Sequence, residues 1–141
     1  MVPMLVHGAT VQGLLDTGAN YNILAASCFR AMPEKYQVLA RPSNLRCYTA
    51  TGQPVDLLGK TRIQFSLGKY EFDDEFLVAD VQRNILGNPF FRKYDAALHY
   101  LEGVVVLSIN TDLKRRAIYQ ICFDERRFTL LKVFRPNTAY M

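Results

Sequence analysis

The sequence predicts a single, mostly β domain, and three observations lead to this prediction. The chain has 141 residues, of which 50% are hydrophobic, so we expect one domain with a buried core rather than a two-domain enzyme. Its apolar residues come in short runs separated by turn residues, and apolar positions at helical spacing are scarce. Gly and Pro number 8 and 6, which is far from the composition of disordered or fibrous chains.

The first segment of the chain predicts three strands and a helix. A hairpin turn is expected at His7-Gly8-Ala9, and Pro33 ends the helix because proline lacks the backbone N–H that a helix interior needs. The expected strands are Val2 to Val6, Thr10 to Leu15 and Tyr21 to Leu24, and the helix runs from Ala25 to Met32.

The middle of the chain predicts four further strands separated by glycine turns. Gly52, Gly59 and Gly68 each lie between two expected strands, and glycine is the residue that most easily permits a tight turn. The expected strands are Leu45 to Thr51, Pro54 to Leu58, Lys60 to Leu67 and Tyr70 to Asp80.

A short helix and a closing hairpin follow. The helix is expected from Asn88 to Tyr94, with Asn88 as its N-cap and Pro89 at the first helical position, where the missing N–H costs little. The hairpin joins Ala97 to Leu101 with Val104 to Ile109. Because the second of these is the most apolar strand, and such an edge invites aggregation, we expect it to be buried against a symmetry mate or within the closing sheet.

The positive charge belongs to the C-terminal segment. The net charge is +4, yet residues 1–109 contain ten Lys/Arg and ten Asp/Glu, whereas residues 110–141 contain seven and three. We therefore divide the chain into a neutral domain, 1–109, and a basic extension, 110–141, that is either a linker or an added β-hairpin. Nucleic-acid binding by the neutral body is not expected, and a weak RNA contact of the extension is the less favoured alternative.

The cysteines, the histidines and the hydropathy argue against a metal site and a membrane span. Cys28, Cys47 and Cys122 are odd in number and lack CxxC spacing, and with only His7 and His99 they form a poor ligand set. We expect reduced thiols, no metal and no cofactor. No apolar run approaches the roughly 18 residues of a membrane span.

The stretch from Gly13 to Asn20 is the strongest candidate for chemistry. A hydrophobic strand runs into Asp16-Thr17-Gly18, which places a carboxylate at a strand end, a hydroxyl that can brace the loop, and a glycine that permits a tight turn. The alternative is an ordinary Asx turn. These residues alone do not separate the two interpretations.

A second motif makes the sequence resemble a family. Leu14-Leu15-Asp16-Thr17-Gly18-Ala19 is followed by Ile85-Leu86-Gly87, whose glycine lies 71 positions after Asp16, and then by Asn88-Pro89-Phe90-Phe91. Over about residues 2–109 the chain resembles the retropepsins, the aspartic proteases of retroviruses, LTR retrotransposons and pararetroviruses. Phe76 to Gln82 is most similar to gypsy-type retrotransposon proteases.

The resemblance implies a closed, barrel-like β subunit with a flap hairpin and one short C-terminal helix, active as a homodimer. Peptide cleavage by carboxyl groups needs two of them and this chain has one Asp-Thr-Gly, so a twofold axis would bring two copies of Asp16 together. Like charges about 3 Å apart cannot both ionise, and the pair would share one proton. One carboxylate would activate water while its mate protonates the scissile carbonyl.

The resemblance also assigns roles by position. Asp16 would be catalytic, Thr17 would bond to the partner's loop, and Gly18 would present its carbonyl to substrate. Ala19 and Asn20 would line the substrate cleft, where Asn20 departs from the acid that several viral members carry. Asn22 likewise replaces a common Ser, and the sequence assigns no consequence to that change.

The hairpin from Arg46 to Leu58 falls where retropepsins have their flap. Its tip, Thr51-Gly52-Gln53, would cover an extended peptide held mainly through its backbone; the alternative is an ordinary surface turn. Arg92 is a candidate partner for Asp95 or for a loop of the second subunit. We expect the phenylalanines at 65, 72, 76, 90 and 91 to be core residues rather than a ligand site.

The sequence therefore predicts an aspartic endopeptidase that cleaves itself and its neighbours from a viral or retrotransposon polyprotein, in the cytoplasm or in virus-like particles. The extension would then lead to the next polyprotein module or form the added hairpin. Two alternatives stay open: a host-domesticated protease with a cellular substrate, and a protease-fold module that dimerises without cleaving.

Overall fold

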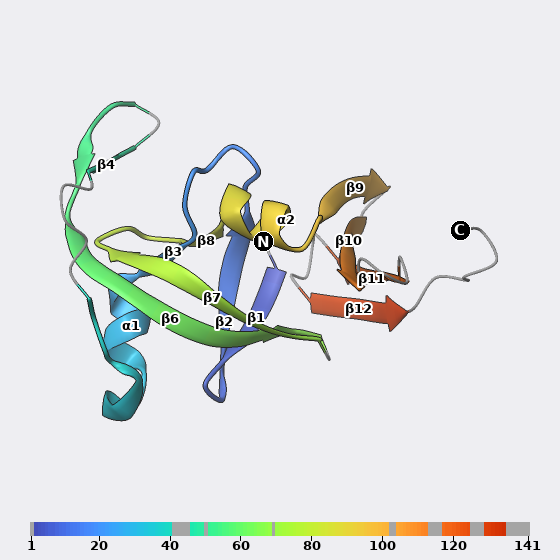
Figure 1. Ribbon diagram of the computed structural model, residues 1–141, viewed down its shortest axis with the longest axis horizontal. Coiled ribbons are helices and arrows are strands. Elements are labelled where there is room, and N and C mark those ends of the chain that lie inside the picture. Colours follow the sequence, from blue (N-terminus) through green and yellow to red (C-terminus); the bar gives the residue numbers. More distant parts are fainter. Residues whose placement is uncertain are drawn as a thin grey trace.

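The computed structural model describes residues 2–40, 46–49, 51–68, 70–101, 104–112, 117–124 and 129–134. For residues 101, 110–112, 117–124 and 129–134 it describes the path and pairing of the backbone. Within these ranges the chain forms strands, two short α-helices and one 3-10 helix, which confirms the predicted mostly β fold (Figure 1). None of the helices in the described ranges is long and apolar enough to cross a membrane.

Six strands close into a barrel at the centre of the molecule. Sequential strands form two antiparallel hairpins, β1 with β2 and β6 with β7. The short strands β8 and β3 fill the gap between these hairpins, with β8 parallel to β2 and β3 parallel to β7. In barrel order the strands are β1 (Val2–Val6), β2 (Ala9–Leu15), β8 (Asn84–Leu86), β3 (Ile23–Ala25), β7 (Tyr70–Ala79) and β6 (Leu57–Leu67).

The barrel is filled by one face of each strand. Along β6, Ile63 and Phe65 are at most 2% exposed and Gln64 between them is exposed, as the period of two in a strand requires. The aromatic rings of the core pack edge to face or offset; the centroids of Phe72 and Phe90 lie 5.3 Å apart. The five phenylalanines expected to be core residues are all buried, which confirms that prediction.

Helices cover the barrel where the chain leaves β3 and β8. Helix α1 (Ala26–Ala31) follows β3 and buries Phe29, and the 3-10 helix η1 (Glu34–Tyr36) comes after it. Helix α2 (Asn88–Lys93) follows β8 and buries both of its phenylalanines. The ring of Phe90 contacts Phe65 and Phe72, so α2 is packed directly onto the β6–β7 hairpin.

The C-terminal part of the chain forms a second, four-stranded sheet beside the barrel (Figure 1). Leu107 and Ile109 are fully buried, so the apolar segment 104–109 lies within a sheet, one of its two predicted environments. The last two strands pair antiparallel with each other, and β12 contacts β1. The division of the chain at residue 109 stays a prediction. The strands are β9 (Ala97–Leu101), β10 (Val104–Asp112), β11 (Ala117–Asp124) and β12 (Thr129–Phe134).

The structure differs from the sequence prediction at three places. Gly59 is not a turn between two strands, because β6 runs through it with a register shift. Position 59 requires glycine for two reasons: its φ is +155°, and a Cβ there would lie 2.8 Å from the carbonyl oxygen of Ala40. The N-cap of α2 is Gly87, and Asn88, the expected N-cap, is already the first residue of the helix. The strand predicted from Tyr21 begins only at Ile23, because the residues before it belong to the loop described next.

Candidate active site

The Asp-Thr-Gly motif lies at the carboxyl end of β2, directly beside the second motif of the sequence. The parallel register pairs Leu14 with Ile85 and Leu15 with Leu86. The backbone N–H of Asp16 continues this ladder by donating to the Leu86 carbonyl at 3.0 Å. Two motifs far apart in the chain are thus brought together by one pair of strands.

The residues that follow β2 form a tight turn around the carboxyl group. The N–H of Gly18 donates to Asp16 Oδ1 at 3.0 Å, and the N–H of Ala19 donates to the Asp16 carbonyl at 3.1 Å. Asp16 is half-buried, whereas Thr17 and Asn20 are exposed. One carboxylate oxygen is therefore oriented by the backbone of its own turn, at a surface that a peptide or a second subunit can reach.

Three consecutive residues hold the loop of residues 16–22, which we call the Asp16 loop. We call Leu86, Gly87 and Asn88 the clamp. Leu86 accepts the bond from the start of the loop. Asn88 donates its N–H to the carbonyl of Ala19 in the middle of the loop at 2.7 Å. Gly87 donates its N–H to the side chain of Asn22, the last residue of the loop, at 2.9 Å.

Gly87 is the tightest point of this arrangement. A Cβ placed on it would lie 2.3 Å from the carbonyl oxygen of Tyr21 and 2.8 Å from that of Ala19, closer than any side chain tolerates. Gly87 is the glycine of the second sequence motif, Ile85-Leu86-Gly87. Its close neighbour in the structure is the Asp16 loop.

Two buried asparagines that sequence reasoning did not assign join the same region. Asn22 and Asn84 are 3% and 4% exposed. Asn84 Oδ1 accepts from the N–H of Ala25 at 2.8 Å, and its Nδ2 donates to the Gln12 carbonyl at 2.9 Å and to Cys28 Sγ at 3.4 Å. The available signal was an amide directly before a short apolar run, Ile23-Leu24 or Ile85-Leu86, because a buried amide must find hydrogen-bond partners.

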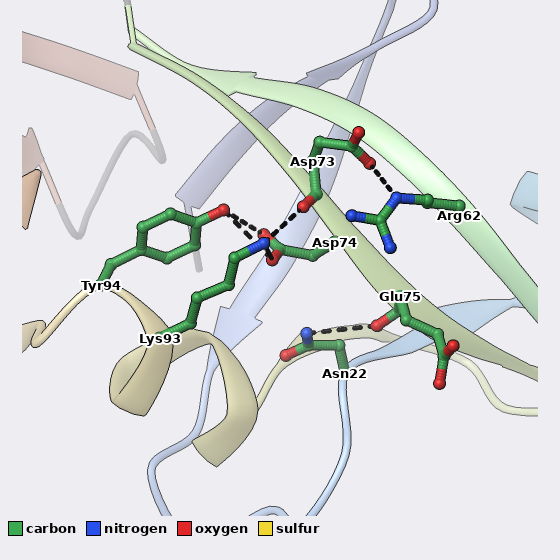
Figure 2. Close-up of polar contacts among 7 residues, drawn as sticks. All are labelled: Asn22, Arg62, Asp73, Asp74, Glu75, Lys93 and Tyr94. Atoms are coloured by element: carbon green, nitrogen blue, oxygen red, sulfur yellow. Dashed lines mark hydrogen bonds and ion pairs between the residues drawn. The ribbon is translucent and has the colours of Figure 1, made fainter.

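A buried acid on β7 anchors the other end of α2 (Figure 2). The Asp74 side chain is only 5% exposed and lies 2.8 Å from Lys93 Nζ, and the Tyr94 hydroxyl donates to both of its oxygens, at 3.1 and 3.0 Å. The bond to Asp74 raises the pKa of Lys93, and burial followed by the Asp74 charge raises the pKa of Tyr94. The ion pair of this helix therefore uses Lys93, next to the arginine that the sequence suggested.

The predicted flap is a small hairpin that projects from the barrel (Figure 1). Strands β4 (Cys47–Tyr48) and β5 (Pro54–Val55) pair antiparallel, which confirms a hairpin but not its role. At the tip, Thr49 and Gln53 bond through their backbones at 2.8 Å, and Gly52 has a φ of +86°. Cys47 at its base is half-buried, and burial raises the pKa of its thiol.

The structure thus groups the predicted site residues into two places. Asp16, Thr17, Gly18, Ala19 and Asn20 share one turn, next to the clamp. Thr51, Gly52 and Gln53 share the hairpin tip, on a different element. A half-exposed carboxylate on a braced turn can serve as an acid or base, and one such group in each chain leaves a second carboxyl to be supplied from elsewhere.

Comparisons with known proteins agree with this arrangement. The sequence matches the family described as aspartyl protease over residues 2–90. The EIAV protease, solved in complex with the inhibitor HBY-793, is similar in structure with a TM-score of 0.54 and 21% identity, over 70% of this chain and 90% of that one. The retroviral protease-like domain of Ddi1 from Leishmania major is similar with a TM-score of 0.55 and 14% identity, over 99% and 95%. These likenesses confirm the predicted retropepsin-like fold. No curated protein matches the sequence.

Proposed function

The chain belongs to the aspartyl protease family, and from this premise we propose that it is an aspartic endopeptidase whose catalytic group is Asp16. The observation that supports the proposal best is the geometry of the Asp16 loop. The carboxyl group stands at the end of β2, one of its oxygens accepts a backbone bond at 3.0 Å, and the loop around it is held to the clamp at its start, middle and end.

The proposed active form is a homodimer. The sequence contains a single Asp-Thr-Gly, and cleavage by acid and base needs two carboxyl groups at one site. A twofold axis next to the half-exposed Asp16 turn would supply the second group from an identical chain, since an isologous interface uses the same patch on both subunits. Thr17, which is exposed in the single subunit, would then bond to the partner's loop.

The proposed reaction follows from two carboxyl groups that share one proton. The unprotonated Asp16 takes a proton from a water molecule, and the oxygen of that water attacks the scissile carbonyl carbon. The protonated Asp16 of the second subunit donates its proton to the carbonyl oxygen. The first Asp16 then gives its proton to the leaving nitrogen while the second takes one from a hydroxyl of the tetrahedral intermediate, so the C–N bond breaks and the pair again shares one proton. Gly18, Ala19 and Asn20 would bind the peptide backbone, and the hairpin tip would cover it.

We propose a viral or retrotransposon polyprotein as the substrate, with processing in the cytoplasm or in virus-like particles. The resemblance of Phe76 to Gln82 to gypsy-type retrotransposon proteases supports this assignment. One observation favours an alternative, a protease with a cellular substrate: the similarity to the Ddi1 domain extends over 99% of this chain. The parent reading frame distinguishes the two, because an element would carry a reverse transcriptase in the same frame.

The test compares the wild-type protein with Asp16→Asn. Both are incubated with the precursor polypeptide and with an internally quenched peptide library at about pH 4 to 7, and fragments are mapped by mass spectrometry. We expect Asp16→Asn to lower turnover by at least about 10³-fold while its circular dichroism and melting temperature stay near wild type, because the amide oxygen can still accept the Gly18 bond.

Two further measurements make this test decisive. Specific activity should rise with protein concentration through the range in which light scattering shows the dimer forming. Equal activity of Asp16→Asn and wild type, or full activity of the monomer, would contradict the proposal. So would the absence of any wild-type turnover of both substrates, which is the outcome expected of a module that dimerises without cleaving.

A further inference from the structure

The last residue of the Asp16 loop is polar, buried and bonded at both ends of its side chain. Asn22 Oδ1 accepts from the Gly87 N–H at 2.9 Å, and Nδ2 donates to the Glu75 carbonyl at 3.3 Å. The carbonyl of Asn22 also accepts from the N–H of Leu77 at 2.9 Å. Figure 2 shows the Asn22 carboxamide facing the backbone of β7. One side chain thus joins the loop to the clamp and to β7.

A residue that only filled space here would be apolar, like Ile23 and Leu24 that follow it. A buried amide without partners costs about 1–3 kcal/mol, and the Asn22 carboxamide avoids that cost only while Gly87 and Glu75 both stay in place. Its planar amide separates the acceptor from the donor, and so it spans two backbones at once. The side chain therefore sets a distance between elements rather than merely occupying a cavity.

Gly87, which donates to Asn22, lies between the two clamp residues that hold the rest of the Asp16 loop. Gly87 lies between Leu86, which accepts the Asp16 N–H at 3.0 Å, and Asn88, which donates to Ala19 at 2.7 Å. A shift of Gly87 away from Asn22 would therefore alter both neighbouring bonds. Asn22 thus bonds to the N–H of the Leu86–Gly87 peptide unit, and the carbonyl of the same peptide unit accepts the N–H of Asp16.

We propose that Asn22 is a positioning residue of this active centre: its bond to the Gly87 N–H holds the clamp at the distance that orients Asp16. The proposal rests on the proposed function and adds to it a residue that does not touch the substrate. The hydroxyl in Asn22→Thr is shorter than the carboxamide but keeps an acceptor for the Gly87 N–H, so this variant should retain part of the role, and Asn22→Val, with the same shape and no hydroxyl, should retain none.

The test uses the matched pair Asn22→Thr and Asn22→Val, which have nearly the same shape and differ in one hydroxyl. The kinetics are measured with an internally quenched peptide that the wild type cleaves, at a temperature at which circular dichroism shows each variant folded. We expect Asn22→Val to lower kcat about 100-fold with KM within about threefold of wild type, because a small displacement of a catalytic group has effects of that size. The kcat of Asn22→Thr should stay within about tenfold of wild type. In nuclear magnetic resonance, the Gly87 amide should exchange faster in Asn22→Val than in Asn22→Thr.

Asn84→Leu is the control for a purely structural role. Asn84 is as buried as Asn22 and bonds to three other residues, but those bonds go to Ala25, Gln12 and Cys28 rather than to the Asp16 loop. We expect its melting temperature to fall at least as far as that of Asn22→Val, with kcat per folded molecule within about threefold of wild type. If Asn22→Val does not fold, Asn22→Ala removes the same acceptor without a branched side chain.

The outcomes separate the two proposals. An active wild type with equal kcat for Asn22→Thr and Asn22→Val overturns the positioning role alone. An equal loss of kcat in Asn84→Leu does the same, because general destabilisation would then explain the effect. A wild type without Asp16-dependent turnover overturns the proposed function, and the positioning role with it.

Discussion

The Asp16 loop and the hairpin tip are both short turns that contain threonine and glycine, but they are held in opposite ways. The loop is tied to residues far away in the sequence, with Asn22 bonding across 65 and 53 positions. The tip residues that the structure describes bond to one another, with the Thr49 hydroxyl engaging residues 2 and 4 positions ahead. The conformation of the loop is thus a property of the whole barrel, and that of the tip is local.

This difference matches what the two regions would have to do in the proposed enzyme. A catalytic carboxyl group must be held in place, because reaction rates depend steeply on orientation. A hairpin that covers the substrate must open for each turnover, and segments with few long-range contacts open at low cost in free energy. Substitutions at one glycine in each region test whether the contrast is real.

The largest effect is expected on the side of the loop, from Gly87→Ala. The added Cβ would lie 2.3 Å from the Tyr21 carbonyl oxygen, and both groups belong to backbone that cannot give way without moving the clamp. We expect the free energy of unfolding in urea to fall by about 3 kcal/mol and peptide cleavage to be lost in the folded fraction. A loss below about 0.5 kcal/mol, the range of ordinary surface substitutions, would show that the clamp is not rigid.

A smaller loss of stability is expected at alkaline pH, and it concerns the C-terminal end of helix α2, which begins at Asn88 of the clamp. The folded-state pKa values of Lys93 and Tyr94 are both raised, chiefly by the bond to Asp74 and by burial, respectively. Their contribution to stability is therefore complete below the unfolded values, near about pH 10, and is lost as pH rises through the folded values. The free energy of unfolding should fall above about pH 10, as urea titrations can measure.

Tyr94→Phe is the matched variant for this prediction. It removes one titrating group and the hydroxyl that bonds to Asp74, so stability at neutral pH should fall by about 1 kcal/mol while the alkaline decline becomes shallower. Thr49, Thr51, Gly52 and Gln53 at the tip have no group that ionises in this range. An unchanged alkaline slope in Tyr94→Phe would contradict the assignment of that slope to the polar contacts between β7 and α2.

The smallest effect is expected at the tip, from Gly52→Ala. Its φ of +86° disfavours any side chain, but an added Cβ would meet nothing within 4 Å. The cost should be about 1 kcal/mol, and it should be confined to the hairpin. For the proposed flap we expect KM to rise a fewfold with kcat near wild type in the peptide assay. A loss of stability equal to that of Gly87→Ala would remove the distinction between the two regions.

The sequence was most informative where structure depends on near neighbours. Short apolar runs separated by glycine predicted the strands of the β6–β7 hairpin, and the glycine at position 52 predicted the turn between β4 and β5. The Asp-Thr-Gly motif marked its own turn, because its bonds close within four residues. The strand that was expected to stop at Gly59 continues through it. This glycine is required by the nearby backbone of Ala40, which comes from a distant part of the chain and gives no local signal in the sequence.

The buried polar contacts were outside the reach of such reasoning. Asn22, Asp74 and Asn84 look like ordinary polar residues in the sequence, and nothing near them indicates a partner. Asp74 pairs with Lys93, and Asn84 bonds to Gln12, 72 positions away. Such pairs form only when the barrel closes, because two segments that are distant in the sequence must first lie side by side.

The amino-acid sequence by itself determined that this chain folds as a mostly β domain with one carboxylate at the end of a hydrophobic strand, because apolar periodicity and turn chemistry act over a few residues. Only the tertiary structure decided how that carboxylate is held. The parallel pairing of β2 with β8 brings Gly87 against the Asp16 loop, where Asn22 bonds to it. A hydrogen bond between residues 65 positions apart depends on the closure of the barrel, which no local pattern encodes.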